Sequence, residues 1–201
     1  MESVRTPLRA VSPLPSSPDD QGWHYTARPE WSSSGESMWM RLSKFSYCNR
    51  LSVAELVGLF GATQPDIGVG SVDLRQADHW NTQALATILN TSADDVLSGF
   101  CNRTLQPIFG RAAAELRYCP ACLKLGFHAA WFQWLHIERC PLHDLPLRTG
   151  CMRCKSSIPY VLVITLLKSR WRALAAPRCG HPVSAGLPVV ACLWVAVRFG
   201  F

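Results

Sequence analysis

Apolar residues recur at helical spacing early in the chain. Met38, Leu42 and Phe45 fall at i, i+4 and i+7, which places them on one face of a helix that begins near Ser34. Upstream, residues 1–30 are rich in proline, serine and charge and poor in aliphatic side chains. Such a composition is typical of disordered segments, so the sequence predicts a disordered arm there.

A second helix is predicted downstream, and a loop follows it. Ser52 and Glu55 form an S-x-x-E capping box, and Gly61 is expected to end the helix. Residues 62–80 carry turn-forming residues and no apolar periodicity, so they are expected to form a loop.

Residues 81–100 predict two short helices joined by a tight turn. Asn90 lies where a left-handed backbone is needed, and Ser92 with Asp95 is expected to cap the second helix. The pattern is like that of a helix-turn-helix, whose recognition helix presents its first turn to DNA phosphates. Here that turn would hold Asp94 and Asp95, which would repel DNA. A structural or protein-binding hairpin is therefore favoured over a DNA reader.

Two apolar stretches lie near the end of the chain, at residues 160–167 and 187–197. Both are shorter than the roughly 20 apolar residues that a membrane-spanning helix needs. We expect buried strands or core segments, with contact between the tail and a membrane surface as the alternative. The N-terminus has no apolar segment typical of a secretory signal, so a cytoplasmic, reducing location is expected.

Charge is divided unevenly along the chain. The net charge is +6 over 201 residues, but residues 1–116 hold nine Lys/Arg against twelve Asp/Glu, and residues 117–201 hold eleven against two. The second half is therefore strongly basic. A basic half suits a polyanionic partner, most often nucleic acid, and a solvated basic face without a partner is the alternative.

Five of the nine cysteines lie between positions 119 and 154. In a reducing compartment, clustered cysteines favour metal over disulfides. Cys119 and Cys122 form a C-x2-C knuckle, and Cys140 and His143 form a C-x2-H knuckle 17 residues further on. Two such knuckles supply the four tetrahedral ligands of a structural Zn²⁺ site, so the sequence predicts one zinc ion here.

A second set of candidate ligands begins at Cys151 and Cys154. Its other half would come from Cys179 and His181 in PRCGHP, with Cys192 as a further candidate. This set is less regular than the first, so a second zinc ion is the less secure prediction. The alternative is that Cys151 and Cys154 stay reduced thiols or hold metal weakly.

The segment between the first two knuckles is expected to form a helix over residues 127–136. Its inner face would carry Trp131, Leu135 and Phe132, packed against the metal site. The two histidines of the segment, His128 and His136, are expected in packing or surface roles rather than as ligands. The isolated cysteines, Cys48, Cys101 and Cys192, are expected in the core.

The same residues argue against catalysis. A nucleophilic cysteine needs an exposed thiolate and an oriented base, whereas Cys140 and His143 fit a knuckle whose partner knuckle is present. No H-x-E arrangement accompanies the cysteines, as it does in zinc deaminases. The chain is therefore expected not to be an enzyme.

The string LRYCPACLKLGFHAAWFQWLHIERCPLHDLPLRTGCMRC, followed by IPY, resembles the zinc-binding core of the TniQ family. Those proteins select or mark the target in bacterial transposition, some beside a transposition ATPase and some with a CRISPR surveillance complex. GESMWMRLSKFSYCNRLSVAELVGLFG and NTQALATILNTSADDVLSGF are similar to the family's helical regions. The resemblance covers roughly residues 28–182 and is strongest over 117–160.

The resemblance implies which residues would bind metal. Cys119, Cys122, Cys140 and His143 match the family's first zinc site, and Cys151, Cys154 and Cys179 match three ligands of its second. The family more often has a further cysteine where this chain has Ala176, so His181 would substitute or the site would be degraded. Longer relatives carry a further C-terminal helical domain, so the chain resembles a short, C-terminally truncated member.

Pattern and resemblance together predict a mostly α fold with a zinc-ribbon or knuckle-type core and small irregular β content. The expected divisions are a disordered arm (1–30), a helix-turn-helix-like helical region (31–116), a zinc-binding core (117–182) and a short apolar tail (183–201).

We expect a non-enzymatic zinc-binding adaptor of DNA transposition that helps select or mark target DNA and recruits transposition proteins. A zinc-stabilised DNA-binding transcriptional regulator and a non-functional truncated remnant are the alternatives. Expected partners are DNA, a transposition ATPase, transposase or related complex, and a second copy in a homodimer, but no membrane. The candidate phosphate contacts are Lys124, Arg139, Arg148, Arg153, Lys155, Lys168, Arg170 and Arg172.

Overall fold

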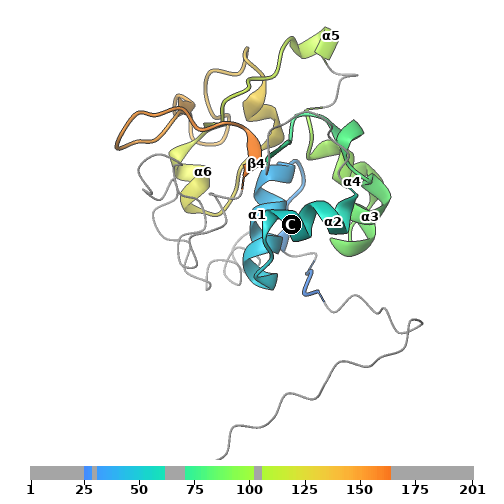
Figure 1. Ribbon diagram of the computed structural model, residues 1–201. Helices are drawn as coiled ribbons and strands as arrows, with labels where there is room; N and C mark the ends of the chain where they lie inside the picture. The colour runs from blue at the N-terminus through green and yellow to red at the C-terminus, as the bar shows by residue number, and fades with distance from the viewer. Residues whose placement is uncertain (1–24, 29–30, 62–70, 102–105, 164–201) are drawn as a thin grey trace, which may run out of the picture.

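The computed structural model describes residues 25–28, 31–61, 71–101 and 106–163 (Figure 1). Short helices and two-stranded antiparallel sheets make up this part of the chain. None of the helices in these ranges is long and apolar enough to cross a lipid bilayer. Some predictions fall on residues outside these ranges. These are the arm before residue 25, the tail over 183–201, and the single residues Lys168, Arg170, Arg172, Cys179, His181 and Cys192.

The end of the predicted arm contacts the body of the protein. Thr26 N–H donates to Asn49 Oδ1 (2.7 Å), and Asn49 Nδ2 donates to the Thr26 carbonyl (3.0 Å). The rings of Tyr25 and Phe45 lie 5.8 Å apart. Residues 25 and 26 therefore contact the first helix, although the composition of the arm alone is typical of disorder.

Helix α1 (Met38–Asn49) begins later than the predicted start near Ser34. Ser37 is its N-cap, with an extended backbone, and the Ser37 hydroxyl accepts a hydrogen bond from the Met40 N–H (3.2 Å). Capping of this kind satisfies a backbone donor that the helix itself cannot pair. The predicted apolar face is buried, since Met38, Leu42 and Phe45 are at most 2% exposed.

Helix α2 (Val53–Phe60) confirms the predicted capping box. Glu55 N–H donates to Ser52 Oγ (3.2 Å), and Ser52 N–H donates back to the Glu55 carboxylate (2.6 Å). Gly61 follows with a φ of 55° and ends the helix, as expected.

Part of the predicted loop over 62–80 forms a strand. β1 (Ser71–Asp73) pairs antiparallel with β4 (Val161–Val163), with Val72 opposite Leu162. A short 3-10 turn, η2 (Ala77–His79), follows β1. The loop prediction is wrong at these residues because the partner strand is remote in sequence and leaves no local periodicity. Of the stretch 160–167, predicted as a buried strand or core segment, β4 forms a strand in which Leu162 is buried and Val161 half-buried, and residues 164–167 lie outside the described residues.

The predicted pair of short helices is confirmed as α3 (Thr82–Ile88) and α4 (Ala93–Ser98). Asn90 has a φ of 51° in the turn between them. The Ser92 hydroxyl accepts from the Asp95 N–H (3.0 Å) and caps α4. α3 packs against both α2 and α4, on one side of the molecule in Figure 1.

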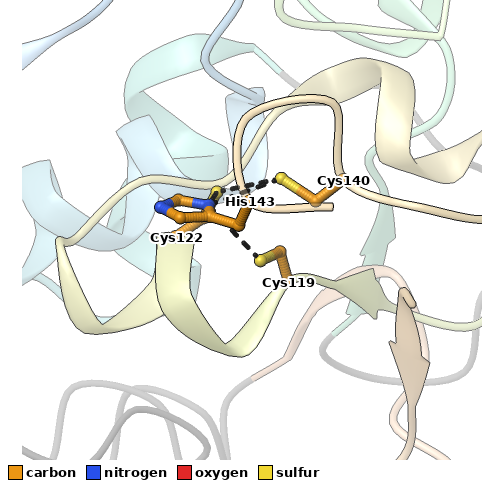
Figure 2. A group of neighbouring side chains, drawn as sticks. All are labelled: Cys119, Cys122, Cys140 and His143. Atoms are coloured by element: carbon orange, nitrogen blue, oxygen red, sulfur yellow. Dashed lines mark hydrogen bonds between the residues drawn. The ribbon is translucent and has the colours of Figure 1, made fainter. Parts of the chain in front are cut away.

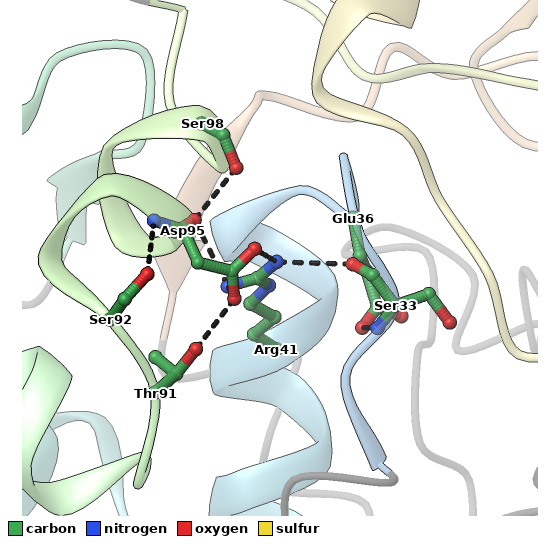
Figure 3. A network of polar contacts seen from close by, with 7 residues as sticks. All are labelled: Ser33, Glu36, Arg41, Thr91, Ser92, Asp95 and Ser98. Carbon is green, nitrogen blue, oxygen red and sulfur yellow. Dashed lines mark hydrogen bonds and ion pairs between the residues drawn. The ribbon is translucent and has the colours of Figure 1, made fainter.

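A largely buried ion pair joins α4 to α1 (Figure 3). The Arg41 side chain, 1% exposed, donates to both carboxylate oxygens of Asp95 (2.7 and 3.0 Å) and to the Ser33 carbonyl (3.0 Å). Burial opposes ionisation of Asp95, but hydrogen bonds from Arg41 and Thr91 outweigh it and hold the pKa of Asp95 below its usual value. Of the two carboxylates expected to repel DNA, Asp94 is exposed and Asp95 is half-buried.

The main hydrophobic core continues across the boundary predicted at residue 116. It joins the buried faces of the helices to Leu116, Tyr118, Ile158 and Tyr160. β2 (Arg117–Tyr118) pairs antiparallel with β3 (Arg148–Thr149), and Leu116 N–H donates to the Ile158 carbonyl (2.7 Å). The helical region therefore shares its core with part of residues 116–162, while Cys119, Cys122 and Cys140 lie in a second buried cluster with Ala129 and Phe132.

His128 links the start of α1 to the cysteine-rich region. Its ring is fully buried, with Nδ1 2.7 Å from Ser37 Oγ and Nε2 2.9 Å from the Arg117 carbonyl. Because a carbonyl only accepts, Nε2 carries the proton and Nδ1 accepts from the Ser37 hydroxyl. Burial lowers the pKa of His128 to about 4, so the ring is neutral near pH 7. The predicted packing role is confirmed.

The helix predicted over residues 127–136 is wrong. Only a short 3-10 segment, η4 (Ala130–Gln133), forms, and Ala129 and Trp134 on either side are extended. Both flanking residues form antiparallel bridges with distant backbone, so tertiary pairing overrides the helical spacing. Of the predicted inner face, Phe132 is buried, Trp131 is half-buried and Leu135 is exposed.

Of the remaining predictions about single residues, two are confirmed and one is wrong. His136 is exposed and stacks on Phe109, at the end of α5 (Gln106–Phe109), with ring centroids 5.4 Å apart. Its predicted surface role is confirmed. Cys101 is buried in the core as predicted, whereas Cys48 is only half-buried because it lies in the last turn of α1.

The Arg41–Asp95 pair gives a stability prediction. Removing the carboxylate in Asp95→Ala leaves the guanidinium of Arg41 buried with only carbonyl partners, so we expect a loss of about 2–3 kcal/mol in unfolding free energy, below the 3–5 kcal/mol of a fully buried pair. Urea unfolding measures this loss. The matched control is Asp94→Ala, which removes an exposed neighbouring carboxylate and should cost at most about 1 kcal/mol. Equal effects of the two substitutions would contradict the prediction.

Candidate metal centre

One short helix supplies the first two candidate ligands. Cys119 is the residue before α6 (Pro120–Lys124), and Cys122 lies within it. Pro120 occupies the first helical position, where its missing N–H costs nothing and its fixed φ suits the helix. Gly126, with a φ of 71°, ends the turn that follows. The single helical turn brings both thiols to the same side.

A tight turn supplies the other two candidate ligands, Cys140 and His143. Cys140 N–H donates to the Leu145 carbonyl and Asp144 N–H donates to the Cys140 carbonyl, both at 2.8 Å. Asp144 has a φ of 49°, which closes the turn. Cys140 and His143 are thereby held three residues apart on its inner side.

The four ligand atoms converge on one point (Figure 2). Cys122 Sγ and Cys140 Sγ lie 3.6 Å apart, and His143 Nδ1 lies 3.3 to 3.7 Å from the three sulfurs. A tetrahedral zinc ion with Zn–S of about 2.3 Å and Zn–N of about 2.0–2.1 Å would set these separations at about 3.8 Å and 3.6 Å. All four atoms lie within 4.8 Å of one another, so the cluster could hold a metal ion.

The chemistry of the cluster favours a structural ion. The three cysteines are free thiols and at most 1% exposed, and His143 is half-buried. Burial and the adjacent thiols raise the pKa of Cys122, because clustered thiolates would repel one another in a poorly solvated site. A divalent cation would offset that repulsion. Four protein ligands leave no open position for a substrate or reactive water, which catalytic zinc sites require.

Arg139 and Asp144 brace the second turn from outside. Arg139 Nε donates to Asp144 Oδ1 (2.8 Å), and the same guanidinium donates to the Asp144 carbonyl. Arg139 directly precedes Cys140, and Asp144 directly follows His143, so the pair closes the turn across both ligands. Both side chains are exposed, so the pair supports the backbone of the turn and makes no hydrogen bond to a ligand atom.

The turn at Cys151 repeats the hydrogen bonds of the turn at Cys140. Cys151 N–H donates to the Ser156 carbonyl (2.8 Å), and Lys155 N–H donates to the Cys151 carbonyl (2.9 Å). Lys155 has a φ of 58°, matching Asp144 at the equivalent position. Cys151 and Cys154 therefore occupy the places that Cys140 and His143 occupy in the first turn.

Close packing restricts the residue before this second turn. Gly150 has a φ of 72°, and a Cβ there would lie 2.7 Å from the Ser156 carbonyl oxygen. Cys151 is buried, and its Sγ accepts from the Arg153 N–H (3.4 Å), whereas Cys154 is exposed. Since Cys179 and His181 lie outside the described residues, the second site stays a prediction.

The predicted phosphate contacts within the described ranges all have exposed side chains. Lys124 ends α6, Arg148 begins β3, and Arg153 and Lys155 belong to the Cys151 turn. Arg139 is also exposed, but Asp144 engages its guanidinium. Arg117, which is not one of the predicted contacts, is buried and donates to the carbonyls of Trp134 and Ile137.

Two functional features of this centre were missed from the sequence. One is the brace between Arg139 and Asp144, for which the string R-C-x2-H-D is a usable signal, because it flanks the ligands with opposite charges. The other is the repeated turn at Cys151, which depends on backbone hydrogen bonds that the C-x2-C spacing does not specify.

The cluster gives a metal-binding prediction. Cys140→Ser replaces a thiolate ligand by a weak one, so metal bound by the purified protein should fall by about one ion per chain, with a lower Tm. Elemental analysis and thermal unfolding measure both. Cys48→Ser, which alters a half-buried cysteine outside the cluster, is the control and should keep the metal. Unchanged metal content in Cys140→Ser would contradict the prediction.

The brace gives a second prediction. Asp144→Ala frees the Arg139 guanidinium and loosens the turn, and because the pair is exposed, metal affinity should fall by no more than about fivefold, which corresponds to about 1 kcal/mol. Competition with a chromogenic chelator measures the affinity. Glu138→Ala removes an exposed acid on the other side of Arg139 and serves as the control. An equal fall in both variants would show that general charge, rather than the brace, matters.

No protein-family model matches the chain, and no curated protein matches it at a significant level.

Proposed function

We propose that the chain is a non-enzymatic, zinc-binding adaptor of DNA transposition that helps to select or mark target DNA and to recruit transposition proteins. Zinc at Cys119, Cys122, Cys140 and His143 would hold a rigid basic platform. A second zinc would bind at the Cys151 turn with Cys179 and His181. The fold proposed for this region is a zinc-ribbon or knuckle-type core.

The observation that carries the proposal is a closed ligand cluster surrounded by exposed cations. Among residues 117–162, the exposed charged side chains are Lys124, Arg139, Arg148, Arg153 and Lys155 against Glu138 and Asp144. Asp144 is already paired with Arg139. The remaining surface is positively charged, which suits contact with a phosphate backbone.

The α3–α4 pair supports a separate role for the helical region. Residues 81–100 contain no lysine or arginine, and Asp94 is exposed in the first turn of α4. Such a surface has no charge attraction for DNA. It is better suited to a protein partner, which for this proposal is the transposition ATPase or transposase.

The proposal predicts salt-dependent binding of duplex DNA by the zinc-loaded chain. The plot of log K against log salt concentration has a negative slope. In the triple variant Arg148→Ala/Arg153→Ala/Lys155→Ala, each lost phosphate contact should make this slope shallower by about 0.9. Fluorescence anisotropy at several salt concentrations measures the slope. Arg50→Ala removes an exposed cation from the end of α1 and should leave it unchanged.

Two results would contradict the proposal. One is an absence of DNA binding at low salt by protein that retains its zinc. The other is binding that persists without salt dependence. Co-purification with an ATPase or transposase encoded beside the gene then separates an adaptor of transposition from a zinc-stabilised transcriptional regulator.

A further inference from the structure

Two of the candidate metal ligands lie close enough to form a disulfide. Cys122 Sγ and Cys140 Sγ are 3.6 Å apart (Figure 2). A disulfide holds its sulfurs about 2.0 Å apart, so bond formation needs an approach of roughly 1.6 Å. Cys122 belongs to α6 and Cys140 to the tight turn, so a small movement of the turn toward α6 supplies that approach.

The turn that carries Cys140 lies at the surface. Pro141, Leu142 and Asp144 are exposed, and His143 is half-buried. The ion pair of Arg139 with Asp144, which spans the turn, is exposed and contributes at most about 1 kcal/mol. Segments held this weakly open locally at small cost. Local opening of the turn would therefore admit a small solute to sulfurs that are otherwise buried.

Metal ligation keeps these sulfurs in their reactive form. A cysteine binds zinc as the thiolate, and the thiolate is also the nucleophile that peroxides oxidise. Cysteines that respond to oxidants combine thiolate character and access with a second thiol that resolves the first product. Cys122 and Cys140 provide this combination, because each is the other's resolving thiol beneath a surface turn.

We infer that the metal centre is a peroxide-sensitive switch, in which hydrogen peroxide converts Cys122 and Cys140 to a disulfide and the metal is released. One thiolate attacks a peroxide oxygen, the O–O bond breaks, and hydroxide leaves, which gives a sulfenic acid. The second thiolate attacks that sulfur, the S–S bond forms, and the S–O bond breaks with loss of a second hydroxide. Each sulfur loses one electron, and the peroxide gains two.

The switch rests on the zinc site of the proposed function and adds regulation to it. The metal loses two of its four ligands, whereas the disulfide keeps α6 joined to the turn, as ligation did. A cross-link of this kind stabilises the folded chain, so the oxidised protein should stay folded without metal. Protein stripped by a chelator has neither link, and its Tm should lie below that of the oxidised form.

The test treats the zinc-loaded full chain, carrying Cys154→Ser, with hydrogen peroxide. This substitution removes an exposed thiol and a ligand of the second predicted site, so the signal reports the first cluster. A chromogenic chelator should record release of about one zinc ion per chain, and mass spectrometry of alkylated peptides should find Cys122 joined to Cys140. Dithiothreitol with added zinc should restore the metal. Oxidation of Met152, which is 47% exposed, shows that the dose was sufficient.

Matched variants separate the predicted disulfide from other oxidation. Cys119→His and Cys140→His both keep four ligands of the kinds found in structural zinc sites. Cys119→His retains the reacting pair and should release zinc as readily as the parent chain. Cys140→His lacks one partner of the pair and should release zinc at least about tenfold more slowly.

Zinc that stays bound after Met152 has been oxidised would overturn the switch and leave the proposed zinc-binding function intact. Release that yields a different disulfide, or equal release rates in the two histidine variants, would do the same. A chain that binds no zinc would overturn both proposals. If a histidine variant binds no zinc, the disulfide mapped in the Cys154→Ser chain decides between these outcomes.

Discussion

The requirement that three thiols and one imidazole meet at one point governs the cysteine-rich half of this protein. Between residues 117 and 149, regular structure is limited to short strands and single helical turns. Elements this short have little stability of their own. The cluster joins Cys122 to Cys140 across the intervening segment, so a bound cation would act as the cross-link that a larger core would otherwise supply.

A second constraint connects that half to the helices. His128 accepts from Ser37 and donates to the Arg117 carbonyl, so the cap of α1 and the strand before the first ligand share one buried side chain. Trp39 lies edge-on to the same ring, 5.1 Å away. The position of the metal cluster is therefore set from the helical region as well as from its own turns. Loss of either half would leave buried polar groups of the other without partners.

Features with local signals were predictable from the sequence, and features that depend on distant pairing were not. The capping box of Ser52 and Glu55, the left-handed turn at Asn90 and the knuckle spacing each lie within a few residues. By contrast, β1 exists because β4 pairs with it, and η4 replaces a predicted helix because its flanks bond to remote backbone. The inward direction of Asp95 likewise depends on Arg41, which the local pattern of acids could not indicate.

The pairing of β1 with β4 has a consequence for how the protein is made. Synthesis proceeds from the N-terminus, so Ser71–Asp73 leaves the ribosome well before Val161–Val163 exists. The hydrogen bond between Ser37 and His128 likewise forms only after residue 128 has been synthesised. Long-range closure of this kind slows folding and leaves apolar surface and an unpaired strand edge uncovered during translation. Chaperones would therefore have the most apolar surface to cover while the helical region has been synthesised and the later segments have not.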